Sequence, residues 1–118
     1  MRPDGPGWAS FIVLSALGCR ASAPTPLSIA TSMAGPDTRV TLTAEPGLKV
    51  NARLAPALEL PDGRVLRFHA ARLTEDSAYF AEPPSAIVPG HPDHVHGTLN
   101  ASVCREDELA CRSVRLTL

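Results

Sequence analysis

Three cysteines are the residues of this 118-residue chain whose chemistry is easiest to specify. Cys104 and Cys111 lie near the C-terminal end with six residues between them, whereas Cys19 stands alone near the start. Two thiols can form a disulfide that stabilises a fold, or a disulfide that exchanges with the thiol of a partner protein. The compartment that the chain reaches and the elements that hold the thiols decide between these chemistries.

The first eighteen residues have the features of a signal peptide. The apolar run Trp8–Leu17 is too short for a transmembrane helix, which needs about 20 residues, but it suits the apolar region of a signal peptide. The tetrapeptide 16–19 resembles a bacterial lipobox, so we expect cleavage after residue 18 and a lipid on Cys19. Ala16 and Gly18 also suit ordinary signal peptidase, which leaves a secreted, unlipidated protein as the alternative.

Residues 19–37 are predicted to be a flexible tether that is anchored to the membrane through the lipid on Cys19. They are rich in Ala, Ser, Thr and Pro and show no sustained apolar period. The chain is then expected in the bacterial cell envelope, with a soluble periplasmic or secreted protein as the alternative. Arg20 is not the Asp that commonly retains lipoproteins in the inner membrane, so the outer membrane is favoured.

From residue 38 onward, apolar and polar residues alternate between turn signals, which indicates antiparallel strands with one face in a core. The predicted strands are 38–44, 48–54, 58–60, 65–70, 94–104 and 111–118. Glu45-Pro46-Gly47 is a turn signal between the first two, and Leu54 is expected to face the core. We predict one all-β domain over 38–118, a small antiparallel β-sandwich of six to eight short strands.

The last two predicted strands can be paired in one register. Placing Cys104 opposite Cys111 pairs Leu99 with Leu116 and Ala101 with Val114 on the inner face, and Asn100 with Arg115 and Ser102 with Ser113 on the outer face. A slip of one residue would turn every apolar side chain of one strand to water. The apolar pattern therefore supports this register independently of the cysteines.

Export and register together predict a disulfide between Cys104 and Cys111. With Cys19 set aside for the lipid, an even pair remains in a compartment where disulfides persist. Opposed residues on antiparallel strands have Cα atoms about 4.5–5.5 Å apart, which a disulfide accepts. Closing a loop of about eight residues corresponds to roughly 2.5 kcal/mol of stabilisation, which suits a structural bond and leaves a redox-active bond open.

The strand Leu48-Lys49-Val50-Asn51, the proline-rich middle section and the closing hairpin Ser102-Val103-Cys104 to Cys111 resemble the amino-terminal domain of DsbD-type thiol:disulfide interchange proteins. The resemblance covers roughly residues 38–118. It implies an immunoglobulin-like sandwich in which the two cysteines exchange electrons with a periplasmic thiol-containing partner. An aromatic residue that shields the pair would be Phe68, Tyr79 or Phe80. The cysteine spacing is one residue longer than is usual in that family, and Arg112-Ser113 replaces its aromatic residue and proline.

The candidate metal ligands are His91, His94 and His96. His94 and His96 would project from one face of a strand, and imidazole suits zinc or copper. A solvated strand start is the alternative. Cys104 lies about 26 Å beyond His96 along an extended strand, so further ligands would have to come from the middle section, such as His69 or Asp93.

The composition of the chain and the motifs that its sequence lacks argue against several classes of function. The chain has 11 Lys and Arg against 12 Asp and Glu, so it lacks the basic face that nucleic-acid binding needs. No Gly-x-Ser-x-Gly element or phosphate-binding loop gives a hydrolase or transferase signature, and no cofactor is predicted. Asp62 and Asp76 are expected in turns. Three functions remain open: a disulfide-stapled interaction or accessory module, a thiol:disulfide exchange domain, and a metal-binding envelope protein.

Overall fold

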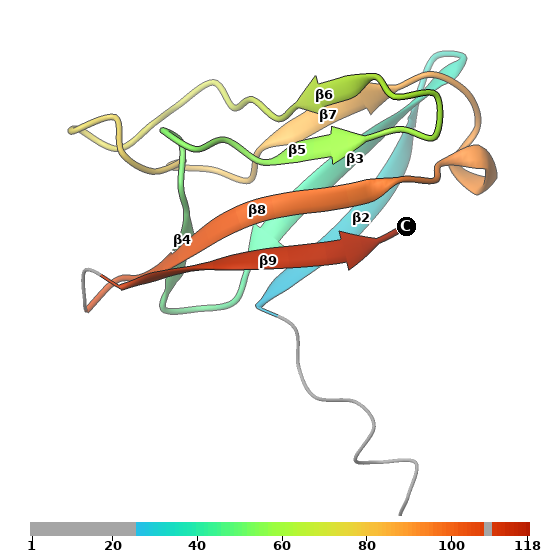
Figure 1. Cartoon of the computed structure of the whole chain (residues 1–118). Coiled ribbons are helices and arrows are strands. Elements are labelled where there is room, and N and C mark those ends of the chain that lie inside the picture. Colours follow the sequence, from blue (N-terminus) through green and yellow to red (C-terminus); the bar gives the residue numbers. More distant parts are fainter. Residues whose placement is uncertain (1–25, 108–109) are drawn as a thin grey trace, which may run out of the picture.

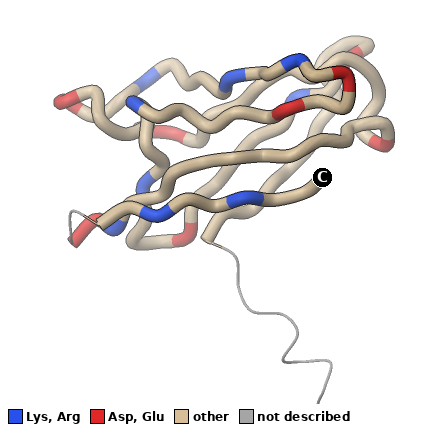
Figure 2. Tube along the Cα trace, viewed as in Figure 1, with Lys and Arg blue, Asp and Glu red and all other residues tan. Residues whose placement is uncertain are grey.

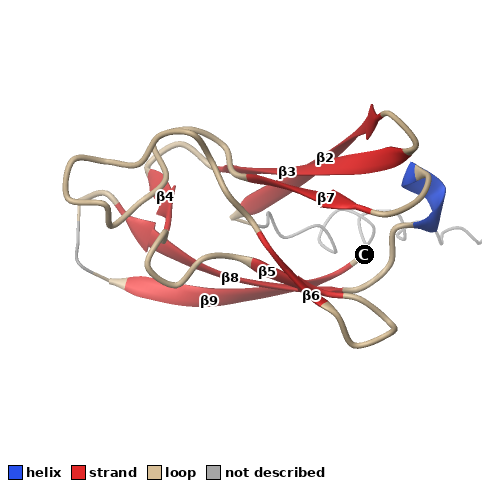
Figure 3. Cartoon of the chain, turned by 90° about the horizontal axis from the view of Figure 1, so that it is seen from above, coloured by secondary structure: helices blue, strands red, loops and turns tan. Residues whose placement is uncertain are grey.

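Two antiparallel sheets face each other in the computed structural model, which describes residues 26–107 and 110–118 (Figures 1 and 3). The smaller sheet has the order β2 (Leu27–Ala34), β3 (Asp37–Ala44) and β7 (Ser85–Val88). The larger sheet contains β4 (Leu48–Val50), β5 (Ala57–Glu59), β6 (Val65–Arg67), β8 (Thr98–Arg105) and β9 (Cys111–Thr117). The predicted all-β sandwich is confirmed, and none of the described helices could span a membrane.

The strand β8 organises the larger sheet. It pairs with β9 along one edge, and on its other edge it pairs with β4 near one end and with β5 near the other (Figure 1). The short strand β6 continues the sheet beyond β5. The residues of β8 therefore have neighbours on both sides, whereas β9 is an edge strand.

The core lies between the two sheets and is built from the alternating apolar residues of their strands. Val40 and Leu42 of β3, Leu58 of β5 and Leu99 of β8 are completely buried, and Phe68 is 1% exposed. Burying a side chain of this size stabilises the fold by about 1.5–3 kcal/mol. The period-two pattern of the sequence therefore identifies the inner faces of these strands correctly.

The predicted tether over 19–37 is wrong in its second half, because residues 27–34 form the strand β2. This strand pairs with β3 along its whole length, from Leu27 opposite Ala44 to Ala34 opposite Asp37. A two-residue turn joins the strands, with Gly35 at a φ of 65°. Leu27 is the only buried residue of β2, so backbone pairing rather than apolar alternation holds this edge strand. The predicted signal peptide and Cys19 lie outside the described residues.

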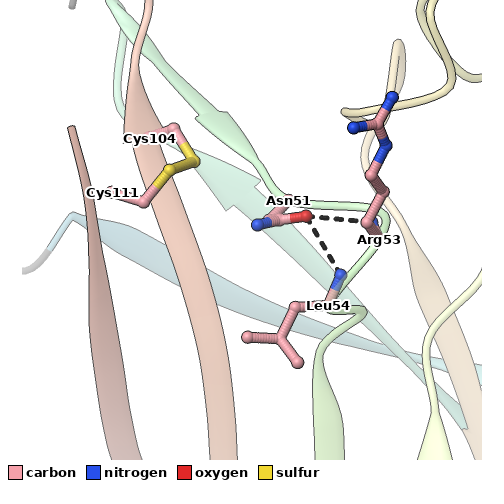
Figure 4. The surroundings of a disulfide bond; sticks show 5 residues. All are labelled: Asn51, Arg53, Leu54, Cys104 and Cys111. Carbon is pink, nitrogen blue, oxygen red and sulfur yellow. Dashed lines mark hydrogen bonds between the residues drawn. A yellow bond between two sulfur atoms is a disulfide. The ribbon is translucent and has the colours of Figure 1, made fainter. Parts of the chain in front are cut away.

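The predicted strand 48–54 is too long. It ends at Val50 because the side chain of Asn51 bends the chain: its Oδ1 accepts hydrogen bonds from the backbone N–H groups of Arg53 and Leu54, at 2.9 and 3.0 Å (Figure 4). Leu54, expected to face the core, is 61% exposed. The strands on either side of the turn at 45–47 lie in different sheets.

The register of the last hairpin is confirmed at every predicted pair, from Leu99 opposite Leu116 to Cys104 opposite Cys111. The strand β8 begins at Thr98 rather than at residue 94. A short 3-10 helix, η2 (Pro92–His94), occupies the chain before it. Gly97 links the two elements and exchanges backbone hydrogen bonds with Leu118.

Candidate functional site

The disulfide between Cys104 and Cys111 joins the last two strands, as the sequence predicts (Figure 4). The Cα atoms of the two cysteines are 3.9 Å apart. The next pair of opposed residues, Arg105 and Ala110, is hydrogen-bonded through the backbone: the N–H of Arg105 donates to the carbonyl of Ala110 at 3.1 Å. The cysteines therefore occupy the narrow, non-hydrogen-bonded kind of antiparallel pair, in which opposed Cα atoms lie closest.

The two cysteines differ in their access to solvent. Cys104 is completely buried, whereas Cys111 is exposed. The reason is their place in the sheet: Cys104 lies on the central strand β8, with β9 on one side and Lys49 of β4 directly opposite on the other. An incoming thiolate would therefore meet the sulfur of Cys111 first. The sequence alternation alone could not reveal this difference, because it does not show which strand is central.

Cys111 borders a hollow of about 220 Å³ at the end of the sandwich. The other residues that line it are Leu48, Val103, Arg105, Ala110 and Arg112. Its two charged lining residues, Arg105 and Arg112, are both basic, and Figure 2 shows acidic and basic residues close together near the tip of the hairpin. The hollow is thus a polar-rimmed depression beside the exposed half of the disulfide.

One of the basic residues near the disulfide is paired with a carboxylate. Arg105 donates from Nε and Nη2 to the two carboxylate oxygens of Asp107, both at 3.1 Å. These hydrogen bonds hold the pKa of Asp107 below its ordinary value. Arg112 is exposed and makes no ion pair with any residue in the described ranges. A cysteine thiolate formed here would therefore have Arg112 and Lys49 as its favourable neighbours.

Lys49 lies between the disulfide and one of the three candidate aromatic residues. Its Nζ lies 5.4 Å from the centre of the Tyr79 ring, within the range of a cation–π contact. Phe68 belongs to the core cluster between the sheets, and Phe80 packs against the second core cluster. Of the three aromatic residues, Tyr79 is the one connected, through Lys49, to the strand position opposite Cys104.

A larger hollow of about 450 Å³ lies where β3 and β4 meet the segment 80–84. Apolar side chains such as Leu42 and Phe80 line it together with Lys49, Glu82 and Glu106. Sequence reasoning missed it, since it is formed by segments that only the tertiary structure brings together. Lys49 thus belongs both to this hollow and to the surroundings of the disulfide.

The candidate metal ligands do not form a cluster. His94 lies in η2 and His96 in the loop that follows, so the expected strand face does not exist, because Pro92 starts a 3-10 turn there. The His91 Nδ1 lies 3.9 Å from a carboxylate oxygen of Asp93, and both side chains are exposed. Within the described part of the chain, no three His, Cys, Asp or Glu residues are grouped as a metal site would require.

Two of the acidic residues are turn residues, as predicted. Asp62 accepts hydrogen bonds from the backbone N–H and the Nε of Arg64, at 3.0 and 2.8 Å. Asp76 accepts from the hydroxyl of Thr74 at 2.8 Å and from the backbone N–H of Ala78 at 3.1 Å. These hydrogen bonds lower the pKa of both carboxyl groups. Both carboxylates therefore serve local turn structure.

The disulfide and its hollow are the chemically distinctive features of the domain. Comparison of the chain with models of protein families, with curated proteins and with solved structures finds no match.

Proposed function

We propose that this protein is a lipoprotein of the bacterial cell envelope whose β-sandwich acts as an interaction or accessory module, with the Cys104–Cys111 disulfide as a structural staple. The observation that carries the proposal is the complete burial of Cys104 on the central strand of the larger sheet. A bond between directly opposed positions of neighbouring strands stabilises the closing hairpin, and the entropy model gives about 2.5 kcal/mol for such a loop.

The proposed location depends on the N-terminal segment. An apolar run of ten residues before Cys19 supports export, and the lipobox-like sequence 16–19 supports lipid attachment to that cysteine. Mass spectrometry of the protein from its own host tests both steps. We expect a mature chain that starts at Cys19 and carries the added mass of a lipid. An uncleaved chain would contradict export, and a cleaved chain without lipid would instead support the secreted, unlipidated form.

The exposure of Cys111 favours a second candidate function, thiol:disulfide exchange with a periplasmic protein. A partner thiolate would attack the Cys111 sulfur, form a mixed disulfide and displace the sulfur of Cys104 as a thiolate. A second thiol of the partner would then displace Cys111, leaving the domain reduced by two electrons and the partner oxidised. Lys49 lies opposite Cys104 in the sheet. Its positive charge would stabilise a thiolate formed on the buried Cys104.

Trapping of a mixed disulfide distinguishes the two candidates. A Cys104→Ala variant keeps the exposed Cys111 and should accumulate a mixed disulfide if the exchange function is correct. The matched control is Cys111→Ala, whose remaining cysteine is buried and should trap far less. If the staple function is correct, neither variant captures a specific partner in envelope extracts, and the wild-type bond stays oxidised in the presence of periplasmic thiol proteins.

A further inference from the structure

Among the described residues, the smaller sheet ends in a long edge strand, β2, that lacks the usual protection against pairing with another strand. The eight residues of β2 include no charged residue and no proline. The other long edge strand, β9, carries Arg112 and Arg115, and the edge strands β6 and β7 have only three and four residues. Charged side chains and short length are the common means by which proteins protect open edges. The edge of β2 has neither.

The hydrogen-bonding pattern shows which backbone groups face this open edge. The N–H of Glu45 donates to the carbonyl of Pro26 at 3.0 Å, which sets the alternation of the β2–β3 ladder. Every second residue from Ser28 to Ser32 therefore bonds to β3. The N–H and C=O groups of Ile29, Thr31 and Met33 point to the open side, where none of residues 26–107 and 110–118 pairs with them.

The side chains around these groups are uncharged and partly exposed. Thr31 is exposed, Met33 is 52% exposed, and Ile29 packs only partly against the core. In Figure 3 the tip of the β2–β3 hairpin projects away from the larger sheet. The tip of the hairpin is therefore not covered by the larger sheet.

We propose that β2 pairs with β2 of a second copy of this chain, antiparallel and across a two-fold axis at Thr31. In this register, the three residues whose backbone groups point to the open side pair with the same three residues of the second copy. Thr31 lies opposite Thr31 of the second copy, and Ile29 lies opposite Met33 of the second copy on both sides of the axis. Each exposed Met33 is then covered by an apolar side chain, and the two three-stranded sheets become one of six strands. Such a contact uses the same surface on both copies, so it closes at the dimer.

The oligomeric state of the full chain tests the proposal. In a Cys19→Ser background, sedimentation equilibrium should show a reversible dimer over a concentration series that reaches about 1 mM, the dissociation constant of a weak complex. Thr31→Pro removes the outward N–H without touching the ladder to β3. It should weaken dimerisation about tenfold or more, because two hydrogen bonds are lost. Thr31→Val keeps that N–H and is the matched control, which should dimerise like wild type.

A crosslink tests the register and does not depend on how the proline variant folds. Thr31→Cys places two thiols on the axis, with Cα atoms about 5.5 Å apart, so oxidation should join two chains rapidly. Ser28→Cys lies on the same strand, but its two copies would be about 20 Å apart, and it should crosslink far more slowly. A wild-type protein that stays monomeric throughout the series, a dimer that Thr31→Pro does not weaken, or equal crosslinking of the two cysteine variants would overturn the proposal.

Discussion

At the scale of single residues, the disulfide is a stabilising feature that two substitutions remove. Replacing both partners, Cys104→Ala with Cys111→Ala, should lower the free energy of unfolding by about 2.5 kcal/mol, because the unfolded chain regains the freedom of the closed loop. Equilibrium unfolding in urea measures the change. Adding a reductant to the wild type should give a similar decrease and should leave the double variant unchanged. Equal stability of the two proteins would contradict a structural role.

Gly97 is required by its surroundings rather than by a turn. A methyl group on this residue would overlap the carbonyl oxygen of Glu59 and would lie 3.0 Å from Cδ1 of Leu58. Gly97→Ala should therefore lower the free energy of unfolding by about 2–3 kcal/mol, as overpacking does. Gly63 is the control: its φ is also positive, at 93°, but the added methyl group meets nothing within 4 Å. Gly63→Ala should cost about 1 kcal/mol, and a smaller effect at Gly97 than at Gly63 would contradict the packing described here.

Asp76 makes the stability of the fold depend on pH. The Thr74 hydroxyl, followed by the N–H of Ala78, lowers the pKa of its carboxyl group below the ordinary value of 3.8. A carboxyl group whose pKa is lower in the folded state contributes stability above its unfolded pKa of about 3.9, and this contribution disappears as the pH falls below it.

Asp76→Asn should therefore reduce the loss of stability between pH 7 and pH 3, since the ionised acceptor is gone. Thermal unfolding of both proteins at the two pH values measures the difference. Glu75 is exposed and adjacent to Asp76, so it makes a matched control: Glu75→Gln should keep the wild-type pH dependence. The same pH dependence in Asp76→Asn and wild type would refute the assignment.

At the scale of elements, β2 belongs to the folded domain. Leu27 is 1% exposed and packs in the core cluster that includes Val103 and Val114. Leu27→Ala should lower the free energy of unfolding by about 2–5 kcal/mol, as truncation of a buried leucine does. The exposed neighbour Ser28 is the control, and Ser28→Ala should change stability by less than about 0.5 kcal/mol. Equal and negligible effects would instead match a tether that reaches residue 37.

The elements predicted best from the sequence are the strands whose two faces differ most in polarity. The register of β8 and β9 followed from alternating apolar residues, because any slip exposes them. The strand β2 was missed because its apolar alternation, Leu27, Ile29 and Met33, is interrupted at Thr31 and only one of these residues is buried; the Gly35-Pro36 pair was the available turn signal. The early end of β4 depends on the side chain of Asn51, a local hydrogen-bonding choice that a periodicity count cannot detect.

Some features of the candidate site could be predicted from the sequence and others could not. The pairing of Cys104 with Cys111 could be derived from the sequence, since it follows from register. Their unequal exposure could not, because burial of Cys104 depends on β4 and β9 flanking the central strand. The histidines were expected on a strand that instead begins at Thr98, since Pro92 starts η2. Long-range strand order was thus the missing information.

At the scale of the whole molecule, the domain combines a staple at one edge with an open strand at another. The disulfide secures β9 to the central strand of the larger sheet, while β2 leaves backbone groups of the smaller sheet without partners in the described ranges. A module that presents a stable edge for pairing needs a rigid sandwich behind it. In the proposed interaction role, the disulfide would contribute stability and the edge of β2 would contribute binding.

The reduction potential of the Cys104–Cys111 bond tests the structural role of the disulfide most directly. It is measured by equilibrating the folded protein with redox buffers of known potential and quantifying the free thiols. A structural bond should have a value below about −300 mV, as is typical of structural disulfides in exported proteins. A value near those of disulfide oxidoreductases, between about −270 and −120 mV, would contradict the staple and identify a bond that exchanges.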